Sequence, residues 1–433
     1  MRSAVLAHPG IYDAQDPRAF PPWGALSVAS ALRSSGWQVA VYDLNGRDVS
    51  KTLHDAVVNS GASVVGLTAK AGLSAVRMRS AVDELRLEFG HEISIVVGGP
   101  LVSTFPDPSL PLWTGVDMLV LGDGEQAFQQ LGPPGRRDLP DLVGPFESQS
   151  YLEFDGALWW EPLSSYVGDA SAWPNFDQPA IHFTAGRGCT RRCTFCYLNH
   201  HSTMSRFRHA DADKLFRLLS EFDQQLAVRG FFFVDDCFID RRRDFIRRFS
   251  YLNATAGVPY NFGLDAQLAD LEDTALLQLL KEMGTRALYV GLESGSASVR
   301  RALGKGTIHS PIKDLVNRAR DHGIVIRASV GIGWPGETLD DMRQTLALID
   351  EIPWLAFDAY KFLPLPRTPL GDSAYWASKG SLGTLAEASN DYSGRNGNFS
   401  SVDDDSFAEV WTELCLRESS RLRDYSAGKF DVW

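Results

Sequence analysis

The chain has 433 residues, of which 44% are hydrophobic and 22% charged, and 42 Lys and Arg against 54 Asp and Glu give a formal net charge of −12. At roughly 100–200 residues per domain, this length predicts two or three domains, and the composition excludes a disordered or collagen-like chain. The pI near 5.3 argues against a general nucleic-acid binder, since phosphate contacts need a clustered basic face. No apolar run reaches the ~18 residues that span a bilayer, and the first residues turn polar too early for a signal peptide, so we expect a cytoplasmic protein without a membrane segment.

Residues 1–130 alternate strand and helix patterns. Apolar and β-branched runs predict strands at 4–8, 38–43, 63–68, 93–98 and 116–121, and helical spacing predicts helices at 23–34 and about 74–89. This alternation predicts an α/β domain with a parallel, doubly wound, Rossmann-like sheet. Glycines follow three of the strands, and ligands bind beyond the carboxyl ends of the strands in such sheets.

Residues 131–178 lack this pattern. Four prolines, at 133, 134, 140 and 145, interrupt any helix there. We therefore expect a linker between two domains.

A second α/β series occupies residues 179–365. Strands are predicted at 181–185, 230–235, 259–264, 287–291, 325–331 and 356–362, and helices at 210–222, 274–281, 310–321 and 339–349. Six β/α units predict a partial (β/α)6 barrel with its chemistry at the carboxyl ends of the strands. Residues 366–433 form a C-terminal extension, in which 407–423 is predicted to be helical.

Three of the five cysteines fall within eight residues, directly after the first strand of this second series. Cys189, Cys193 and Cys196 have the spacing Cys-x3-Cys-x2-Cys. Three thiolates in one loop can hold three irons of a cubane cluster and leave the fourth iron open to a small molecule. A structural zinc site is the alternative, and it needs a fourth ligand such as His200 or His201.

The cysteine run resembles the motif of the radical S-adenosylmethionine (SAM) superfamily. The resemblance implies a [4Fe–4S] cluster that reductively cleaves SAM to methionine and a 5′-deoxyadenosyl radical, which abstracts hydrogen from a substrate carbon. It also implies an electron donor such as a flavodoxin or a ferredoxin. Phe195 corresponds to the family's aromatic residue near the adenine.

Further segments resemble SAM-contact motifs of the family, and each also has an ordinary structural explanation. Asp235 and Asp236 stand where the family contacts the methionyl amine, but an Asp pair at a strand end can also be solvated or cap a helix. Glu293 and Ser294 resemble the Glu-Ser-Gly element near the ribose and carboxylate, or form a turn.

The remaining motif positions lie on the third and fifth strands of the series. The segment with Gly333 and Glu337 resembles the Gly-x-Pro-Gly-Glu-Thr turn beside the adenine, or simply starts a helix. Arg327 is a candidate for the SAM carboxylate, or an exposed strand arginine. Asp265 and Gln267 are candidates for the ribose hydroxyls.

The domain order resembles the subfamily with a cobalamin (B12)-binding-like domain before the barrel. The segments 22–26, 97–100 and 116–125 match this pattern, with small residues that would let a corrin approach the backbone. The family's histidine after Gly-Gly-Pro is replaced by Leu101, so we predict no histidine ligand to cobalt. Binding and loss of cobalamin both remain open.

Two hypotheses share the SAM-derived radical. The first is hydrogen abstraction from a small polar metabolite in natural-product biosynthesis, leading to dehydration or rearrangement, as in diol dehydratases of aminoglycoside assembly, with a nicotinamide-dependent dehydrogenase acting on the product. The replaced histidine, the short extension and the acidic charge favour it. The alternative is a cobalamin-dependent methyltransferase, and a non-catalytic zinc scaffold is a third hypothesis.

A final hydrogen donor to a substrate radical is sought among three side chains. Cys237, Tyr197 and Glu293 are the candidates. A cysteine such as Cys237 is also a common small apolar core residue.

Overall fold

The computed structural model describes residues 2–10, 20–70, 72–131, 135, 138–146, 163–168, 176, 178–200, 207–239, 243–257, 259–365, 368–371, 398–427 and 429. The chain forms two compact units. The first comprises Met1–Trp159, His200–Met204 and Pro364–Arg395, and the second comprises Trp160–Asn199, Ser205–Leu363 and Asn396–Trp433.

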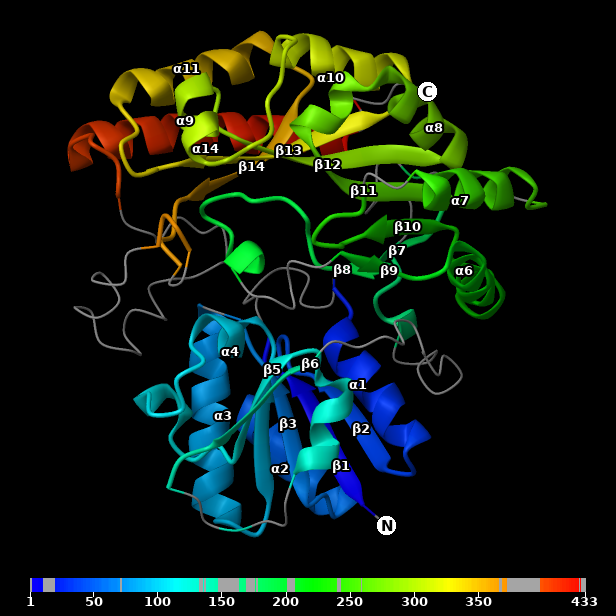
Figure 1. Cartoon of the computed structure of the whole chain (residues 1–433), viewed down its shortest axis with the longest axis vertical. Coiled ribbons are helices and arrows are strands. Elements are labelled where there is room, and N and C mark those ends of the chain that lie inside the picture. Colours follow the sequence, from blue (N-terminus) through cyan, green and yellow to red (C-terminus); the bar gives the residue numbers. More distant parts are fainter. Residues whose placement is uncertain are drawn as a thin grey trace. The chain divides into compact units, whose positions relative to one another are not determined.

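The first unit is built on a six-stranded parallel sheet with the order β2-β1-β3-β4-β5-β6 (Figure 1). The strands are β1 (Ser3–His8), β2 (Gln38–Asp43), β3 (Val64–Thr68), β4 (Ser94–Gly98), β5 (Met118–Gly122) and β6 (Asp141–Phe146). The helices are α1 (Trp23–Ser34), α2 (Val49–Ser60), α3 (Leu73–Phe89) and α4 (Pro100–Thr104), with the short 3-10 segments η1 (Pro111–Trp113) and η2 (Gly124–Gln130). The predicted doubly wound sheet is therefore confirmed.

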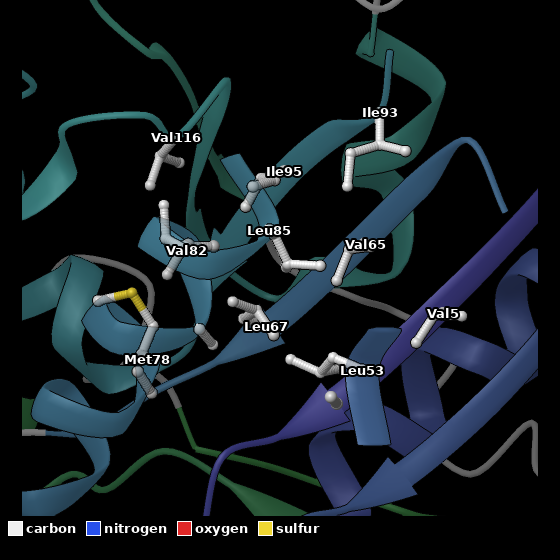
Figure 2. Packing of buried hydrophobic residues seen from close by; sticks show 14 of the residues in the cluster. Val5, Leu53, Val65, Leu67, Met78, Val82, Leu85, Ile93, Ile95 and Val116 are labelled. Carbon is white, nitrogen blue, oxygen red and sulfur yellow. The ribbon is translucent and has the colours of Figure 1, made fainter. Parts of the chain in front are cut away.

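A large hydrophobic core fills one face of this sheet (Figure 2). Alternate residues of the central strands, such as Val65 and Leu67, point toward α2 and α3, which contribute Leu53 and Met78. The opposite face packs on η2, because the position of a Cβ on Gly66 would lie 3.1 Å from the ring of Phe128. Helices on both faces explain why the strands are apolar on both sides.

The sequence analysis did not predict helix α2 or strand β6 of this unit, nor its short segments α4, η1 and η2. Helix α2 begins at the N-cap Asp48, whose carboxylate accepts the N–H of Lys51. Strand β6 lies within the range expected to be a linker, where it pairs with β5 at the edge of the sheet. An edge strand tolerates Pro145, which a central strand would not; the linker interpretation is wrong for Asp141–Phe146.

The second unit is built on a curled parallel sheet with the order β14-β13-β12-β11-β10-β7, as the six predicted β/α units require (Figure 1). Its strands are β7 (Ala180–Phe183), β10 (Gly230–Phe233), β11 (Asn261–Gln267), β12 (Thr285–Glu293), β13 (Val325–Ile332) and β14 (Ala356–Lys361). Its helices are α6 (Ala212–Leu226), α7 (Asp244–Ala254), α8 (Thr274–Met283), α9 (Ala297–Ala302), α10 (Ile312–Asp321) and α11 (Leu339–Glu351). Its short elements include the antiparallel pair β8 (Gly186–Arg187) and β9 (Arg208–His209), and the 3-10 segment η5 (Leu268–Glu272).

The outer edge of β14 is covered by the C-terminal helix α14 (Asp404–Ser426). Glu418 of α14 accepts the backbone N–H of Ala359 at 2.7 Å, so an edge donor of the sheet is satisfied by a side chain. Lys361 lies over the rings of Phe407 and Trp411. These contacts join the extension to the half-barrel and close its exposed strand edge.

Within the described residues, no helix combines the length and the apolar character needed to cross a membrane.

Candidate active site

The three clustered cysteines occupy the loop between β8 and the 3-10 segment η4 (Tyr197–His200). Cys189 and Cys193 are buried and Cys196 is half-buried. The N–H of Cys196 donates to the carbonyl of Cys193, which turns the loop back on itself. The sequence therefore places all three thiols on one short, folded stretch of chain, as predicted.

The pKa values of the three thiols differ because their surroundings differ. The neighbouring side chain of Cys237 lowers the pKa of Cys189 to about 7. Burial raises the pKa of Cys196 to about 12, and it also raises that of Cys193. A metal binds the thiolate, so bound iron would stabilise the charged form of Cys193 and Cys196, which burial disfavours.

The donor set fits an iron–sulfur cluster held by three cysteines. Each of the three thiols lies close enough to influence the charge of another, and all come from one loop. Over the described ranges, no three His, Cys, Asp or Glu side chains already converge on one metal position. The imidazole of His200 and all of His201, the proposed zinc ligands, lie outside the described residues.

Asp235 and Asp236, at the end of β10, hold the backbone that leads into the cysteine loop. Oδ1 of Asp235 accepts the N–H groups of Ala185 and Gly186 at 2.8 and 2.7 Å and the hydroxyl of Thr184 at 2.9 Å. Oδ2 of Asp236 accepts the N–H of Gly188 at 3.0 Å. These bonds give the Asp pair a structural task that the sequence analysis did not foresee.

One oxygen of Asp235 is left for a ligand. The residue is only 3% exposed, and its Oδ2 has no hydrogen-bond partner among the described residues. Burial raises the pKa of Asp235 to about 7, with the nearby charge of Asp236 adding to the shift. Asp265 lies close to both carboxylates, and its pKa is also raised, chiefly by burial. The free oxygen of Asp235 can accept a hydrogen bond from a cationic or hydroxyl-bearing ligand.

Glu293 ends β12 with a backbone conformation that is rare for a residue with a side chain. Its φ is +65°, and the register with β13 shifts at this point. The carboxylate is buried, where Oε1 accepts Lys305 Nζ at 2.8 Å. Oε2 accepts the hydroxyl of Ser329 at 3.1 Å and that of Tyr360. Sequence reasoning found Glu293 and missed its three partners, which come from other strands and loops.

Aromatic side chains line the interior beside this carboxylate. The ring of Phe195, from the cysteine loop, lies 5.2 Å from that of Trp334. Trp334 in turn contacts Tyr360 and Phe362 and donates its indole N–H to the carbonyl of Gly331. Phe195 is therefore part of an apolar wall of tilted and edge-on rings.

The turn after β13 is closed by its own glutamate. Oε2 of Glu337 accepts the N–H of Gly333 at 2.7 Å and that of Trp334 at 3.1 Å. Glu337 is 1% exposed, and its Oε1 has no hydrogen-bond partner in the part of the chain that the structure describes. Burial raises its pKa to about 7. Like Asp235, this residue offers one buried oxygen to a ligand.

Three other predicted site residues are engaged in structural contacts. The Ser294 hydroxyl lies 3.2 Å from that of Thr345 and accepts the N–H of Ser296. The N–H of Gln267 donates to Asp270 at the start of η5. The half-buried Arg327 pairs through its guanidinium with Asp358 on the neighbouring strand.

The proposed hydrogen donors lie beside the cysteine loop. Cys237 is buried against Cys189 and Phe207, and its thiol donates to the carbonyl of Ile239 at 3.1 Å. The hydrogen bond with Cys189, together with burial, raises the pKa of Cys237. Burial likewise raises the pKa of Tyr197. Both side chains therefore hold their protons firmly.

The carboxyl ends of the first sheet show what a corrin would meet. Gly99, after β4, has φ +90°, and a Cβ there would lie 2.6 Å from Thr68 Oγ1. Leu101 is fully buried in the core, so the position of the family's histidine carries no donor atom. Gly99 is therefore required by its packing on Thr68, and position 101 offers no ligand atom to cobalt.

Asp117, in the segment expected near the corrin, has a structural role. Its carboxylate is buried, accepts the N–H of Ile95 at 2.6 Å and pairs with Arg86. Arg86 also donates to the carbonyls of Gly115 and Ile93. The pair ties α3 to the ends of β4 and β5.

Family models match both units of the chain. The model described as the radical SAM superfamily matches residues 183–349, and the model of the B12 binding domain matches residues 14–132. An uncharacterised methyltransferase of Pyrococcus horikoshii is 24% identical over 82% of this chain and 78% of its own length. A putative methylthiotransferase of Methanocaldococcus jannaschii is 22% identical over 81% of this chain and 76% of its own length.

Solved structures share the fold across both units. The radical SAM methyltransferase TsrM from Kitasatospora setae, with cobalamin and a [4Fe–4S] cluster bound, gives a TM-score of 0.66 at 20% identity and covers 86% of this chain and 77% of its own. The cobalamin-dependent radical SAM enzyme OxsB, with aqua-cobalamin bound, gives 0.63 at 16% identity and covers 87% of this chain and 54% of its own.

Proposed function

Because the chain combines a domain of the radical SAM superfamily with a B12 binding domain, we propose that it is a cobalamin-dependent radical SAM methyltransferase acting on a small polar molecule. The names of its relatives, a methyltransferase and a methylthiotransferase, favour methyl transfer over the dehydration that the sequence analysis placed first. Dehydration has no support among these names.

The observation that carries the proposal is the arrangement at the carboxyl ends of the half-barrel strands. Three clustered thiols lie in one loop, and the buried oxygens Asp235 Oδ2 and Glu337 Oε1 stand without partners among the described residues. A group with donor hydrogens, such as the ammonium or ribose of SAM, suits these oxygens. A site of this kind in a chain with a B12 binding domain supports the pairing of the two cofactors.

The residues would act by binding and orientation. Cys189, Cys193 and Cys196 would hold the cluster, and the wall of Phe195 and Trp334 would stack on the adenine. Asp235 and Asp265 would accept hydrogen bonds from SAM while Asp235 also fixes the loop. When bound, the cluster supplies the electron that splits SAM, and cobalamin carries the methyl group.

The reaction balances over two SAM molecules. One loses its methyl group and leaves as S-adenosylhomocysteine. The other takes one electron and yields methionine and 5′-deoxyadenosine, whose new hydrogen comes from the substrate carbon that receives the methyl group. Two electrons would offset the two sulfonium charges overall, and a flavodoxin or ferredoxin would deliver them.

Hydrogen donors to the substrate are not needed in this reaction, because the substrate carbon ends with a methyl group. Cys237 is held by Cys189 and by a backbone carbonyl, which suits positioning of the first cluster ligand. Tyr197 and Cys237 would matter as donors only in the dehydration hypothesis. A nicotinamide-dependent dehydrogenase as partner belongs to that hypothesis as well.

The test uses the full chain, reconstituted without oxygen with iron, sulfide and hydroxocobalamin and then desalted. We expect a retained corrinoid spectrum and, with SAM and a reductant, both S-adenosylhomocysteine and 5′-deoxyadenosine. A variant with all three cluster cysteines replaced by alanine should keep the corrinoid and make no 5′-deoxyadenosine. Loss of all corrinoid on desalting, with 5′-deoxyadenosine as the sole SAM product, would overturn methyl transfer and favour dehydration.

A further inference from the structure

The loop at residues 302–304 is hydrogen-bonded to the cysteine loop. Thr194, between two of the cysteines, donates its N–H to the carbonyl of Leu303 and its hydroxyl to that of Ala302, both at 3.0 Å. Gly304 has φ +66°, and a Cβ there would lie 2.8 Å from the carbonyl oxygen of Arg192. The backbone of residues 302–304 therefore packs directly on the loop, and only a glycine fits at the contact.

This packing places the ammonium group of Lys305 near the cysteine loop. Lys305 follows Gly304, and its Nζ lies 5.8 Å from the centre of the Phe195 ring. The side chain is only 9% exposed. Its Nζ is paired with a carboxylate, so the buried group is a positive charge beside the loop that carries Cys193 and Cys196.

Glu293 keeps this charge in place at a cost in stability. Its carboxylate accepts Lys305 Nζ at 2.8 Å, and its backbone is held at φ +65°. A buried ion pair is weak evidence for stability, because apolar residues of similar volume often serve as well, and a side chain in the left-handed region strains the backbone. Such strain at the end of a barrel strand points to a function for the pair.

The reduction potential of an iron–sulfur cluster depends on nearby charge and on burial. The reduced cluster carries one more negative charge than the oxidised one, so a fixed cation beside its ligands favours reduction. We propose that Lys305, positioned by Glu293, sets the reduction potential of the cluster held by the three cysteines. This rests on the cluster of the proposed function and is independent of methyl transfer.

The test is a redox titration of the reconstituted full-length protein without SAM, followed by the electron paramagnetic resonance signal of the reduced cluster. K305M should shift the midpoint to a more negative value, with a reduced-to-oxidised ratio about tenfold lower at a fixed poise, or about 59 mV for one electron. K305R keeps the charge and should stay near the wild-type midpoint. E293Q removes the opposing anion and should shift the midpoint the other way.

The matched control is Lys313, which pairs with Glu351 at 3.5 Å on the exposed surface. K313M should leave the midpoint unchanged. Iron and sulfide are measured in every variant, so that loss of the cluster is not mistaken for a shifted midpoint potential. If K305M does not bind the cluster, the midpoints of K305R and E293Q decide the test. A K305M midpoint equal to that of K313M, or an E293Q shift in the same direction as K305M, would overturn the inference. Absence of any cluster in the wild type would instead overturn the proposed function.

Discussion

The substitution Asp235→Asn should make the free energy of unfolding fall less as pH rises than it does in the wild type. The folded pKa of this carboxyl is raised from 3.8 to about 7, mainly by burial. A carboxyl whose pKa is raised by folding contributes most below pH 3.8, and its contribution is lost as pH rises toward 7. The asparagine keeps one oxygen for the three donors of residues 184–186 but removes the charge.

The magnitude follows from these two pKa values. Between pH 5 and pH 8 the raised pKa costs the folded state about 2–3 kcal/mol, at about 1.4 kcal/mol for each pKa unit. At about 2–4 °C per kcal/mol for a unit of this size, the wild type should lose about 5–10 °C more in Tm than the variant over this interval.

The assay is thermal unfolding of the metal-free chain at pH 5 and pH 8, followed by circular dichroism. Asp244→Asn is the matched control, because Asp244 lies at the start of α7 with 93% of its side chain exposed and should behave as the wild type does. Equal Tm losses in wild type and Asp235→Asn would refute the reasoning, since the buried carboxyl would then carry no raised pKa.

Three further changes test other parts of the structure. Gly99→Ala places a Cβ 2.6 Å from Thr68 Oγ1 at φ +90° and should destabilise the first unit by about 1–3 kcal/mol in thermal unfolding; an unchanged Tm would contradict the close packing. Arg86→Met leaves the buried Asp117 charge unpaired and should cost about 3–5 kcal/mol in urea unfolding, a loss that R86M/D117L should partly restore if the pair is buried as described. Cys196→Ala should lower bound iron after reconstitution, whereas Cys415→Ala, on α14, should not; equal iron in both would speak against the loop as the cluster site.

The order of strands and helices was largely predictable, because each unit buries its strands on both faces and therefore repeats apolar runs. Helix α1 has the predicted bounds, and the six strands of the half-barrel lie within a few residues of their predicted positions. The missed strand β6 has the sequence Asp-Leu-Val-Gly-Pro-Phe, in which neither alternation nor a long apolar run appears. Its pairing depends on the edge of β5, which is a long-range contact.

The candidate site was predictable where chemistry follows from local spacing. The three cysteines share a loop because they are close in sequence. Lys305 was missed because its place beside Cys193 depends on the packing of Gly304 against the cysteine loop. The glycines that flank Lys305 were the available signal, since a single lysine between two glycines suits a tight loop.

The roles of Asp235 and Glu337 show the other reason why sequence reasoning falls short. Each carboxylate uses one oxygen to fix a turn and keeps the other buried. A motif identifies the residue type at a strand end, but it does not tell which of the two oxygens serves the backbone. That division follows from the path of loops that are distant in sequence.

The most direct test of the account is the formation of 5′-deoxyadenosine by anaerobically reconstituted protein given SAM and a strong reductant. The account predicts this product from the wild type, and none from a protein in which alanine replaces Cys189, Cys193 and Cys196. A wild type that makes none while carrying a full complement of iron and sulfide, or a triple variant that makes as much as the wild type, would contradict it.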